Sequence, residues 1–286
     1  MKETTNDLSM QVNSEGLSHE SAGPPRVSVV IPVYRNAATL EDLHARLSAA
    51  LQPLETSYEM VFVDDACPEN SWAVLEKLAR RDSRVAALAL NQNVGQRRAD
   101  MVGLAFSRGE YVVMMDADLQ DPPEAVPQLL ARLQAGPAAV FGGRRGQYQS
   151  PMRMLTSRVY RVLRQWVCRV PTDAGMFVAM RREVVDALLG LDVREPYLVT
   201  MIGCTGLPTE SIPVVRSLRK TGRSAYSSSM RLKAGCSALL WGLQWRLRLR
   251  LRTAGSRGRQ PIIRERVGSR FTTPSQTSSF FAGVKS

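Results

Sequence analysis

The sequence of 286 residues has few side chains that could bind a soft metal. It contains two His and four Cys, namely Cys67, Cys168, Cys204 and Cys236, which are far apart in the chain. A structural zinc site normally combines several such ligands at short, regular spacing. The composition therefore excludes a zinc-finger class of protein and indicates reduced thiols in a cytosolic chain.

Long apolar runs are also absent. A membrane-spanning helix needs at least about 18 consecutive apolar residues, and the sequence has no such run. Residues 1–25 are polar and lack the basic start and apolar centre of a signal peptide, so we expect them to form a disordered leader. These absences predict a cytoplasmic protein that is peripheral at the inner face of the membrane.

Acidic residues are scarce in the C-terminal quarter. From Arg216 onward the chain has 16 Lys and Arg and one acidic residue, a formal charge of +15, whereas the preceding residues sum to −3. Such a segment is typical of proteins that meet an anionic surface, with a solvated basic tail as the alternative.

Within this quarter, residues 229–252 predict a basic amphipathic helix. Leu240, Trp241 and Trp245 precede arginines that alternate with leucines up to Arg252. Trp rings and Arg stems suit a membrane interface, so we expect contact with the membrane surface, with a homo-oligomer or a membrane partner protein as further possibilities. Packing of the helix on the domain is an equal alternative. Nucleic acid is not expected, because stacking aromatics are missing, and residues 253–286 predict a disordered basic tail.

Strand and helix signals alternate through the rest of the chain. Runs rich in β-branched residues, typical of strands buried on both faces, occupy residues 26–34, 58–63, 85–90, 111–115, 138–141, 175–180 and 211–215. Helical spacing occupies residues 40–51, 72–80, 95–106, 124–133, 151–168 and 182–189. The alternation predicts an α/β fold with a doubly wound, mostly parallel sheet, in a single domain over residues 26–228.

Acidic residues follow two of the expected strands. Asp64 and Asp65 follow residues 58–63, and Asp116 and Asp118 follow residues 111–115. Ligands of open α/β sheets bind at the carboxyl ends of the strands, where these carboxylates would repel one another unless a cation were present. Mg²⁺ or Mn²⁺ explains the pattern, because both prefer oxygen ligands and leave positions open for substrate phosphates.

The second acidic stretch has a regular spacing. Asp116, Asp118 and Gln120 alternate, so their oxygens would face one side if the chain stays extended. Asp121 precedes Pro122-Pro123, and we interpret it as the cap of the helix expected at residues 124–133. A turn that merely leads into this helix is the alternative for Asp118.

Several motifs in a fixed order carry a resemblance to a known family. They are Val29-Val30-Ile31-Pro32-Val33-Tyr34, Val63-Asp64-Asp65, Asn93-x-Gly95 and Asp116-Ala117-Asp118-Leu119-Gln120-Asp121-Pro122-Pro123-Glu124. Together they resemble the GT-A-fold glycosyltransferases of family 2, nearest to the polyprenyl-phosphate branch of enzymes like dolichol-phosphate mannosyltransferase. The resemblance covers roughly residues 26–232 and implies a nucleotide-sugar-binding domain.

The resemblance implies roles at the donor side. A nucleotide-diphosphate sugar would be bound by Pro32, Tyr34, Asp64, Asp65 and Asp116. The metal ligands would be Asp116, Asp118 and Gln120, with Asp118 also counted as catalytic. The family often has an acid two residues after the Tyr, whereas this chain has Asn36, so the nucleotide base stays open.

Later motifs match the acceptor side. The matching catalytic positions are Arg144, Asp173 and Arg219, and those expected to contact acceptor or phosphate are Arg145, Arg153, Ser157, Arg223 and Ser224. A lipid phosphate is already an anion and needs Arg side chains to position it rather than a base. A sugar hydroxyl would instead need a base, and Asp173 is the candidate, although a role as a turn or helix cap is equally open.

These features predict an inverting, metal-dependent glycosyltransferase that moves one sugar from a nucleotide-diphosphate donor to polyprenyl phosphate or another membrane-proximal acceptor. The Gln-x-x-Arg-Trp motif of processive relatives is absent. Transfer to a hydroxyl of a soluble or polysaccharide acceptor is one alternative. A noncatalytic, membrane-associated nucleotide-sugar-binding protein is another, but it has no need for the acidic stretch. A nucleotidyltransferase should have a Gly-rich phosphate loop after the first strand, which residues 32–36 do not form.

Overall fold

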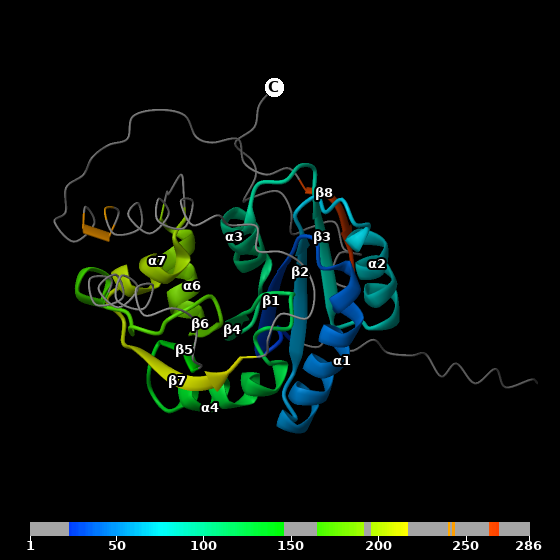
Figure 1. The fold of residues 1–286 in the computed structure, drawn as a ribbon. Coiled ribbons are helices and arrows are strands. Elements are labelled where there is room, and N and C mark those ends of the chain that lie inside the picture. The colour runs from blue at the N-terminus through cyan, green and yellow to red at the C-terminus, as the bar shows by residue number, and fades with distance from the viewer. Residues whose placement is uncertain are drawn as a thin grey trace, which may run out of the picture.

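A computed structural model gives the fold and describes residues 23–145, 165–191, 196–216, 240, 242–243 and 263–268. Its described strands form one sheet with the order β7-β5-β6-β4-β1-β2-β3-β8 (Figure 1). The strands are β1 Val27–Val33, β2 Tyr58–Asp64, β3 Val85–Leu90, β4 Tyr111–Met114, β5 Ala139–Arg145, β6 Val178–Arg181, β7 Thr209–Val215 and β8 Ile263–Val267. All seven strands expected from the sequence are therefore present, with small shifts at their ends.

The sheet is mostly parallel, as predicted. β1 pairs in parallel with β2 and β4, β2 with β3, and β5 with β7. Two strands run the other way: β6 is antiparallel to both β4 and β5, and β8 is antiparallel to β3. The fold class expected from the sequence is confirmed, with these two reversed strands added.

Helices cover both faces of the sheet (Figure 1). They are α1 Leu40–Leu51, α2 Ser71–Arg81, α3 Gln96–Phe106, α4 Val126–Gln134, α6 Arg182–Leu189 and α7 Leu198–Cys204. The helices α1, α2 and α4 pack in one hydrophobic cluster, and α3, α6 and α7 pack in a second cluster on the opposite face. α7 was not expected from the sequence. Of the helix predicted at residues 151–168, residues 165–168 are helical and the others lie outside the described residues.

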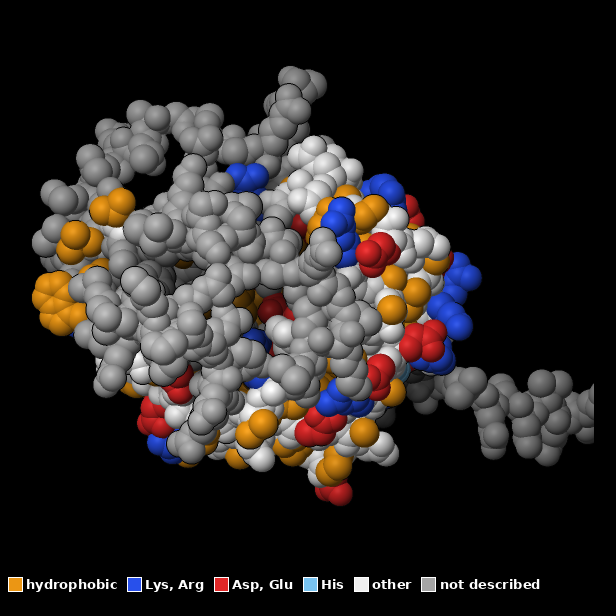
Figure 2. All heavy atoms as spheres, viewed as in Figure 1, with side chains coloured by type: hydrophobic (Ala, Val, Ile, Leu, Met, Phe, Trp, Pro, Cys, Tyr) orange, Lys and Arg blue, Asp and Glu red, His pale blue; other side chains and the backbone are white. Residues whose placement is uncertain are grey.

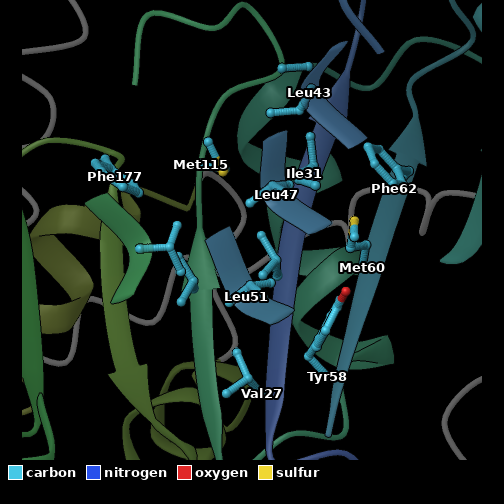
Figure 3. Packing of buried hydrophobic residues seen from close by; sticks show 14 of the residues in the cluster. Val27, Ile31, Leu43, Leu47, Leu51, Tyr58, Met60, Phe62, Met115 and Phe177 are labelled. Atoms are coloured by element: carbon cyan, nitrogen blue, oxygen red, sulfur yellow. The ribbon is translucent and has the colours of Figure 1, made fainter. Parts of the chain in front are cut away.

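The central strands are buried on both faces, which explains their uninterrupted apolar sequences. Successive residues of a strand point to opposite faces. Ile31 accordingly lies in the cluster with α1 and α2, whereas Val30 lies in the cluster with α3. Figure 3 shows Ile31 beside Leu43 and Leu47 of α1, with Phe62 on the neighbouring strand. Because both faces of the sheet are packed, the strands are held in place, and so are the residues at their ends.

The C-terminal part of the chain corrects one prediction. Residues 253–286 were expected to be disordered, but Ile263–Val267 forms β8 against β3. Ile263 packs against one hydrophobic cluster and Val267 against the other. Without β8, β3 would present a row of unpaired backbone groups, and such an edge favours the addition of a strand. The prediction failed because only the folded sheet offers this edge.

The predicted helix at residues 229–252 is described only at residues 240 and 242–243, which are helical. A Cβ at Gly242 would lie 2.9 Å from Cys168 Sγ, so this segment packs against the helix at residues 165–168. Leu240 is 59% exposed. In the described part of the chain, no helix is long and apolar enough to cross a membrane. Residues 1–22 of the predicted leader lie outside the described residues.

Candidate active site

The candidate residues from the sequence meet at one edge of the sheet. Because β1, β2 and β4 are parallel, Tyr34, Asp64 and Asp116 all lie at the carboxyl ends of their strands. β6 is antiparallel to β4 and β5, so Asp173, which precedes β6, lies at the same edge. β7 is parallel to β5 and ends at this edge with Arg216 following it.

The acidic stretch after β4 forms a turn rather than an extended chain. The chain turns at Ala117 and Asp118, and Leu119 has a left-handed φ of 58°. Thr39 donates a hydrogen bond of 2.6 Å from Oγ1 to the Ala117 carbonyl, and Gln120 N donates to Asp118 Oδ1 at 3.1 Å. The expectation that the three oxygens alternate along an extended chain is wrong, because Asp118 stabilises the turn through its own side chain.

Asp116 is held by the start of α3. The Gln96 side chain donates a hydrogen bond of 2.6 Å from Nε2 to Asp116 Oδ1. Gln96 is the first residue of α3, and the partial positive charge of a helix amino end stabilises nearby carboxylates. Gln96 was not among the site residues predicted from the sequence. Its place directly after Asn93-x-Gly95, at the expected helix start, is the signal that could have found it.

Asp65 fixes the loop between β3 and α3. It is 2% exposed, and its carboxylate accepts hydrogen bonds from Val94 N at 2.7 Å, Gly95 N at 2.9 Å and Asn93 Nδ2 at 3.0 Å. Burial raises its pKa, and the two backbone N–H groups oppose that rise. These donors occupy both carboxylate oxygens, so Asp65 positions the loop; direct nucleotide contact stays a prediction.

Asp64 is the other acid of this pair and has fewer partners. Its Oδ1 accepts one hydrogen bond of 3.3 Å from Cys67 N. Burial raises the pKa of Asp64 to about 6, while the Cys67 N–H and the charge of Arg264 act in the opposite direction. Asp64 is therefore the carboxylate of the pair with capacity left for a ligand.

The end of β1 provides one buried and one exposed candidate. Pro32 is buried and lies beside Val63 of β2. Tyr34 is 37% exposed, and the Arg35 guanidinium lies 5.4 Å from the centre of its ring. A ring with an exposed side can stack on a planar ligand such as a nucleotide base.

Asp121 does not cap a helix. The residue that precedes the short 3₁₀ helix Pro123–Ala125 is Pro122, and no side-chain hydrogen bond caps that helix. The Asp121 carboxylate instead pairs through both oxygens with the Arg216 guanidinium. The predicted cap is wrong, because a residue distant in sequence competes for this carboxylate with a charged donor.

This pair brings a cation among the acids. Asp121 is 0% and Arg216 is 11% exposed at the side chain. Burial alone would lower the pKa of Arg216, but the hydrogen bond to Asp121 and the charges of Asp116 and Asp118 outweigh it and raise the pKa. The end of β7 therefore faces the acidic turn of β4.

Asp100 is a buried acid that was not predicted from the sequence. It lies in α3, is 0% exposed, and neither carboxylate oxygen has a hydrogen-bond partner among the described residues. Burial raises its pKa well above the usual value, and the charges of Asp116 and Asp65 raise it further. A single Asp in a helical pattern looks like a surface residue, so no sequence signal marks it.

On the acceptor side, Asp173 lies between β5 and β7. It accepts a hydrogen bond of 2.8 Å from Ser211 Oγ, and a Cβ at Gly143 would overlap its carboxylate. Gly143 therefore allows Asp173 to approach the backbone of β5 just before Arg144 and Arg145, whose backbone completes that strand.

The other acceptor-side candidates lie outside the described residues. They are Arg153, Ser157, Arg219, Arg223 and Ser224. The side chains of Arg144 and Arg145 are likewise outside the described part. The roles expected for these residues stay predictions.

Comparison with known proteins shows the family of the chain. The model of glycosyl transferase family 2 matches residues 28–189. The chain belongs to family 2 of the glycosyltransferases. It is 38% identical over 209 residues to an undecaprenyl-phosphate 4-deoxy-4-formamido-L-arabinose transferase of Pseudomonas fluorescens, covering 72% of this chain and 61% of that protein. The chain thus spans about three fifths of the length of this curated relative.

Solved structures of two glycosyl-transferring enzymes share the fold. A mannosyltransferase of Pyrobaculum calidifontis in complex with GDP-mannose and Mn²⁺ is 19% identical, with a TM-score of 0.53 over 82% of this chain and 77% of that chain. A glucosyl-3-phosphoglycerate synthase of Mycobacterium tuberculosis in complex with Mn²⁺, UDP and phosphoglyceric acid is 20% identical, with a TM-score of 0.55 over 78% of each chain. The predicted GT-A-type fold is confirmed.

Proposed function

We propose that this protein is an inverting, metal-dependent glycosyltransferase that moves one sugar from a nucleoside-diphosphate donor to polyprenyl phosphate. The observation that carries the proposal is the acidic turn after β4. Asp116 and Asp118 lie at the carboxyl edge of the sheet, held by Gln96 and Thr39 and faced by Arg216. This is the edge at which open α/β sheets bind their ligands.

The residues of the turn fit a hard divalent cation. Asp116, Asp118 and Gln120 offer side-chain oxygens, which Mg²⁺ and Mn²⁺ prefer. In the part of the chain that the structure covers, no three His, Cys, Asp or Glu form a group that could hold a metal. Few protein ligands suit an ion that shares its coordination with a substrate diphosphate. When bound, such an ion stabilises negative charge on the departing diphosphate.

The name of the Pseudomonas fluorescens relative supports polyprenyl phosphate as the acceptor class. A phosphate oxygen of the acceptor would attack the anomeric carbon, and the bond from that carbon to the donor diphosphate would break. The nucleoside diphosphate leaves and the anomeric configuration inverts. Because the attacking phosphate is already an anion, no residue has to remove a proton, and Arg144, Arg145 and Arg216 would orient and neutralise the phosphates.

Exposed apolar side chains support action at a membrane surface. Trp166 is 65%, Leu240 59% and Leu243 37% exposed. Hydrophobic side chains protrude at the left edge of Figure 2, where Figure 1 draws residues 240 and 242–243, whereas acidic and basic side chains mix over α1 and α2. Aromatic and aliphatic side chains beside a basic segment are typical of interfacial binding, so we propose that this edge contacts anionic lipid at the inner face.

The test is transfer in vitro. The full chain is incubated with a panel of nucleotide sugars, with Mn²⁺ or Mg²⁺, and with or without undecaprenyl phosphate in detergent. We expect a glycosylated lipid that forms only when the metal and the lipid phosphate are both present. Donor binding with no transfer to any acceptor would contradict the proposal and favour a noncatalytic binding protein.

Transfer to a sugar hydroxyl is a second candidate, supported by Asp173. Its carboxylate lies at the site edge with Ser211 as its hydrogen-bond partner, so it could accept a proton from an acceptor hydroxyl. Under this mechanism Asp173→Asn would abolish transfer. With a phosphate acceptor, the same variant would retain most of its activity.

A further inference from the structure

The C-terminal strand β8 reaches the same edge of the sheet as the donor-binding residues. It is antiparallel to β3, so its first residues lie at the carboxyl end of β3. The order β2-β3-β8 places it two strand spacings, about 10 Å, from β2, which ends at Asp64. The expected metal-binding turn after β4 is four spacings, about 19 Å, from β8. β8 is therefore next to the nucleoside end of the site and distant from the diphosphate end.

A β-bulge is present in β8 at this end. Ala89 is opposite Glu265, but the next residue, Leu90, is opposite Ile263. Arg264 is consequently the additional residue of the bulge. A bulge interrupts the regular alternation of side chains and turns the extra residue in a new direction, and bulges are frequent beside active sites.

Arg264 acts electrostatically on Asp64. Its charge favours the ionised form of this buried carboxyl. The side chain of Arg264 is 55% exposed, and its ion pair is to the adjacent Glu265, also exposed, at 2.9 Å. Exposed pairs of this kind are weak, so the guanidinium can exchange Glu265 for a ligand.

We propose that β8 closes the nucleoside side of the donor site and that Arg264 contacts the base or ribose of the nucleoside diphosphate beside Asp64. This inference rests on the proposed function and adds a donor-positioning residue from a segment outside residues 28–189, to which the family model is matched. The guanidinium would donate hydrogen bonds to oxygens of the nucleoside, which an Arg does in a fixed, planar geometry.

Gly268 shows that the position of β8 is tightly defined. Its φ is 135°, and a Cβ at this residue would lie 2.7 Å from the Val85 carbonyl oxygen of β3. The backbone after β8 passes so close to β3 that only a residue without a Cβ fits at position 268. Gly268→Ala should therefore shift the end of β8 without changing any charge, and it perturbs Arg264 by a second, independent route.

The test compares Arg264→Gln with two matched controls on the same strand. Arg266→Gln removes an equal charge from a side chain that stacks 5.3 Å from the Phe106 ring, and Glu265→Gln removes the ion-pair partner. Calorimetry with Mn²⁺ measures the binding of UDP, GDP, CDP and ADP to the full-length wild type. The nucleotide that binds most tightly, together with inorganic pyrophosphate, is then titrated into each variant.

We expect Arg264→Gln to weaken binding of the nucleoside diphosphate about tenfold or more, with pyrophosphate binding unchanged. Both controls should stay within about twofold of wild type, and Gly268→Ala should show the same selective loss. Unchanged nucleotide affinity in Arg264→Gln, or an equal loss for pyrophosphate, overturns the inference. If the wild type transfers sugar and Arg264→Gln binds the nucleoside diphosphate as tightly as wild type, the inference about Arg264 is overturned but the proposed function is retained. A wild type that binds no nucleotide overturns both.

Discussion

Asp100 provides the most direct test of how the core beneath the site is built. Its carboxyl group is fully buried in α3 without a hydrogen-bond partner among the described residues, and burial raises its pKa well above the usual value. In the unfolded chain the same carboxyl ionises near pH 4. Between these two pKa values, folding must take up one proton, and the cost of that uptake grows with pH.

The sign and the size of the effect follow from proton linkage. Because the folded pKa is raised, the stability is fully present below the unfolded pKa and is lost as the pH rises toward the folded pKa. The loss is about 1.4 kcal/mol for each pH unit, or about 3 kcal/mol over the two units between pH 5 and pH 7 while the folded carboxyl stays protonated. Asp100→Asn removes this proton uptake and keeps the shape of the side chain.

The assay is urea unfolding of wild type and Asp100→Asn at several pH values between 4 and 8. Chelator keeps the neighbouring Asp116 free of metal. We expect the variant to gain stability over wild type as the pH rises above the unfolded pKa, by up to about 1.4 kcal/mol for each pH unit over which the folded Asp100 carboxyl stays protonated. Asp100→Glu serves as the control that retains a titrating carboxyl. A difference between wild type and Asp100→Asn that is independent of pH would refute the reasoning.

Four further predictions address the site and the membrane surface. Asp118→Ala should lower transfer at least about a hundredfold with an unchanged circular dichroism spectrum, because donor charge is no longer balanced; full activity, or equal wild-type activity in chelator, would contradict this. Arg216→Ala should destabilise the fold by about 3–5 kcal/mol in urea unfolding, because it leaves the Asp121 carboxylate buried and unpaired. The double variant that combines Arg216→Leu with Asp121→Asn should recover much of that loss. The raised pKa of Asp64, about 6, means that it ionises as the pH rises through 6, so nucleotide affinity should rise across this range in wild type and lose that step in Asp64→Asn. Replacement of the four alternate arginines at residues 246–252 by Gln should release the protein from anionic vesicles at low salt, since each arginine near the surface contributes about 1 kcal/mol to the binding free energy. Deletion of the whole tail is a poorer test because it also removes β8.

The sequence alone determined the sheet and the edge at which the candidate site residues meet. Uninterrupted β-branched runs such as Val27–Val33 can be buried only between two layers of helices, so they predicted a parallel α/β sheet. Acids directly after β2 and β4 predicted the functional edge, because a parallel sheet brings carboxyl ends together. Both signals are local in the chain, which is why they could be read without the structure.

The partners of the polar side chains were decided by the tertiary structure. Asp121 was interpreted as a cap from the prolines beside it, but Arg216, 95 residues later, forms the pair. Asp100 is buried because α3 turns that side toward the acids at the strand ends. β8 forms because β3 leaves an open edge, a property of the assembled sheet. A buried carboxylate pairs with a strong donor that the fold brings close to it. The spacing of residues in the sequence predicts only those donors that are close along the chain.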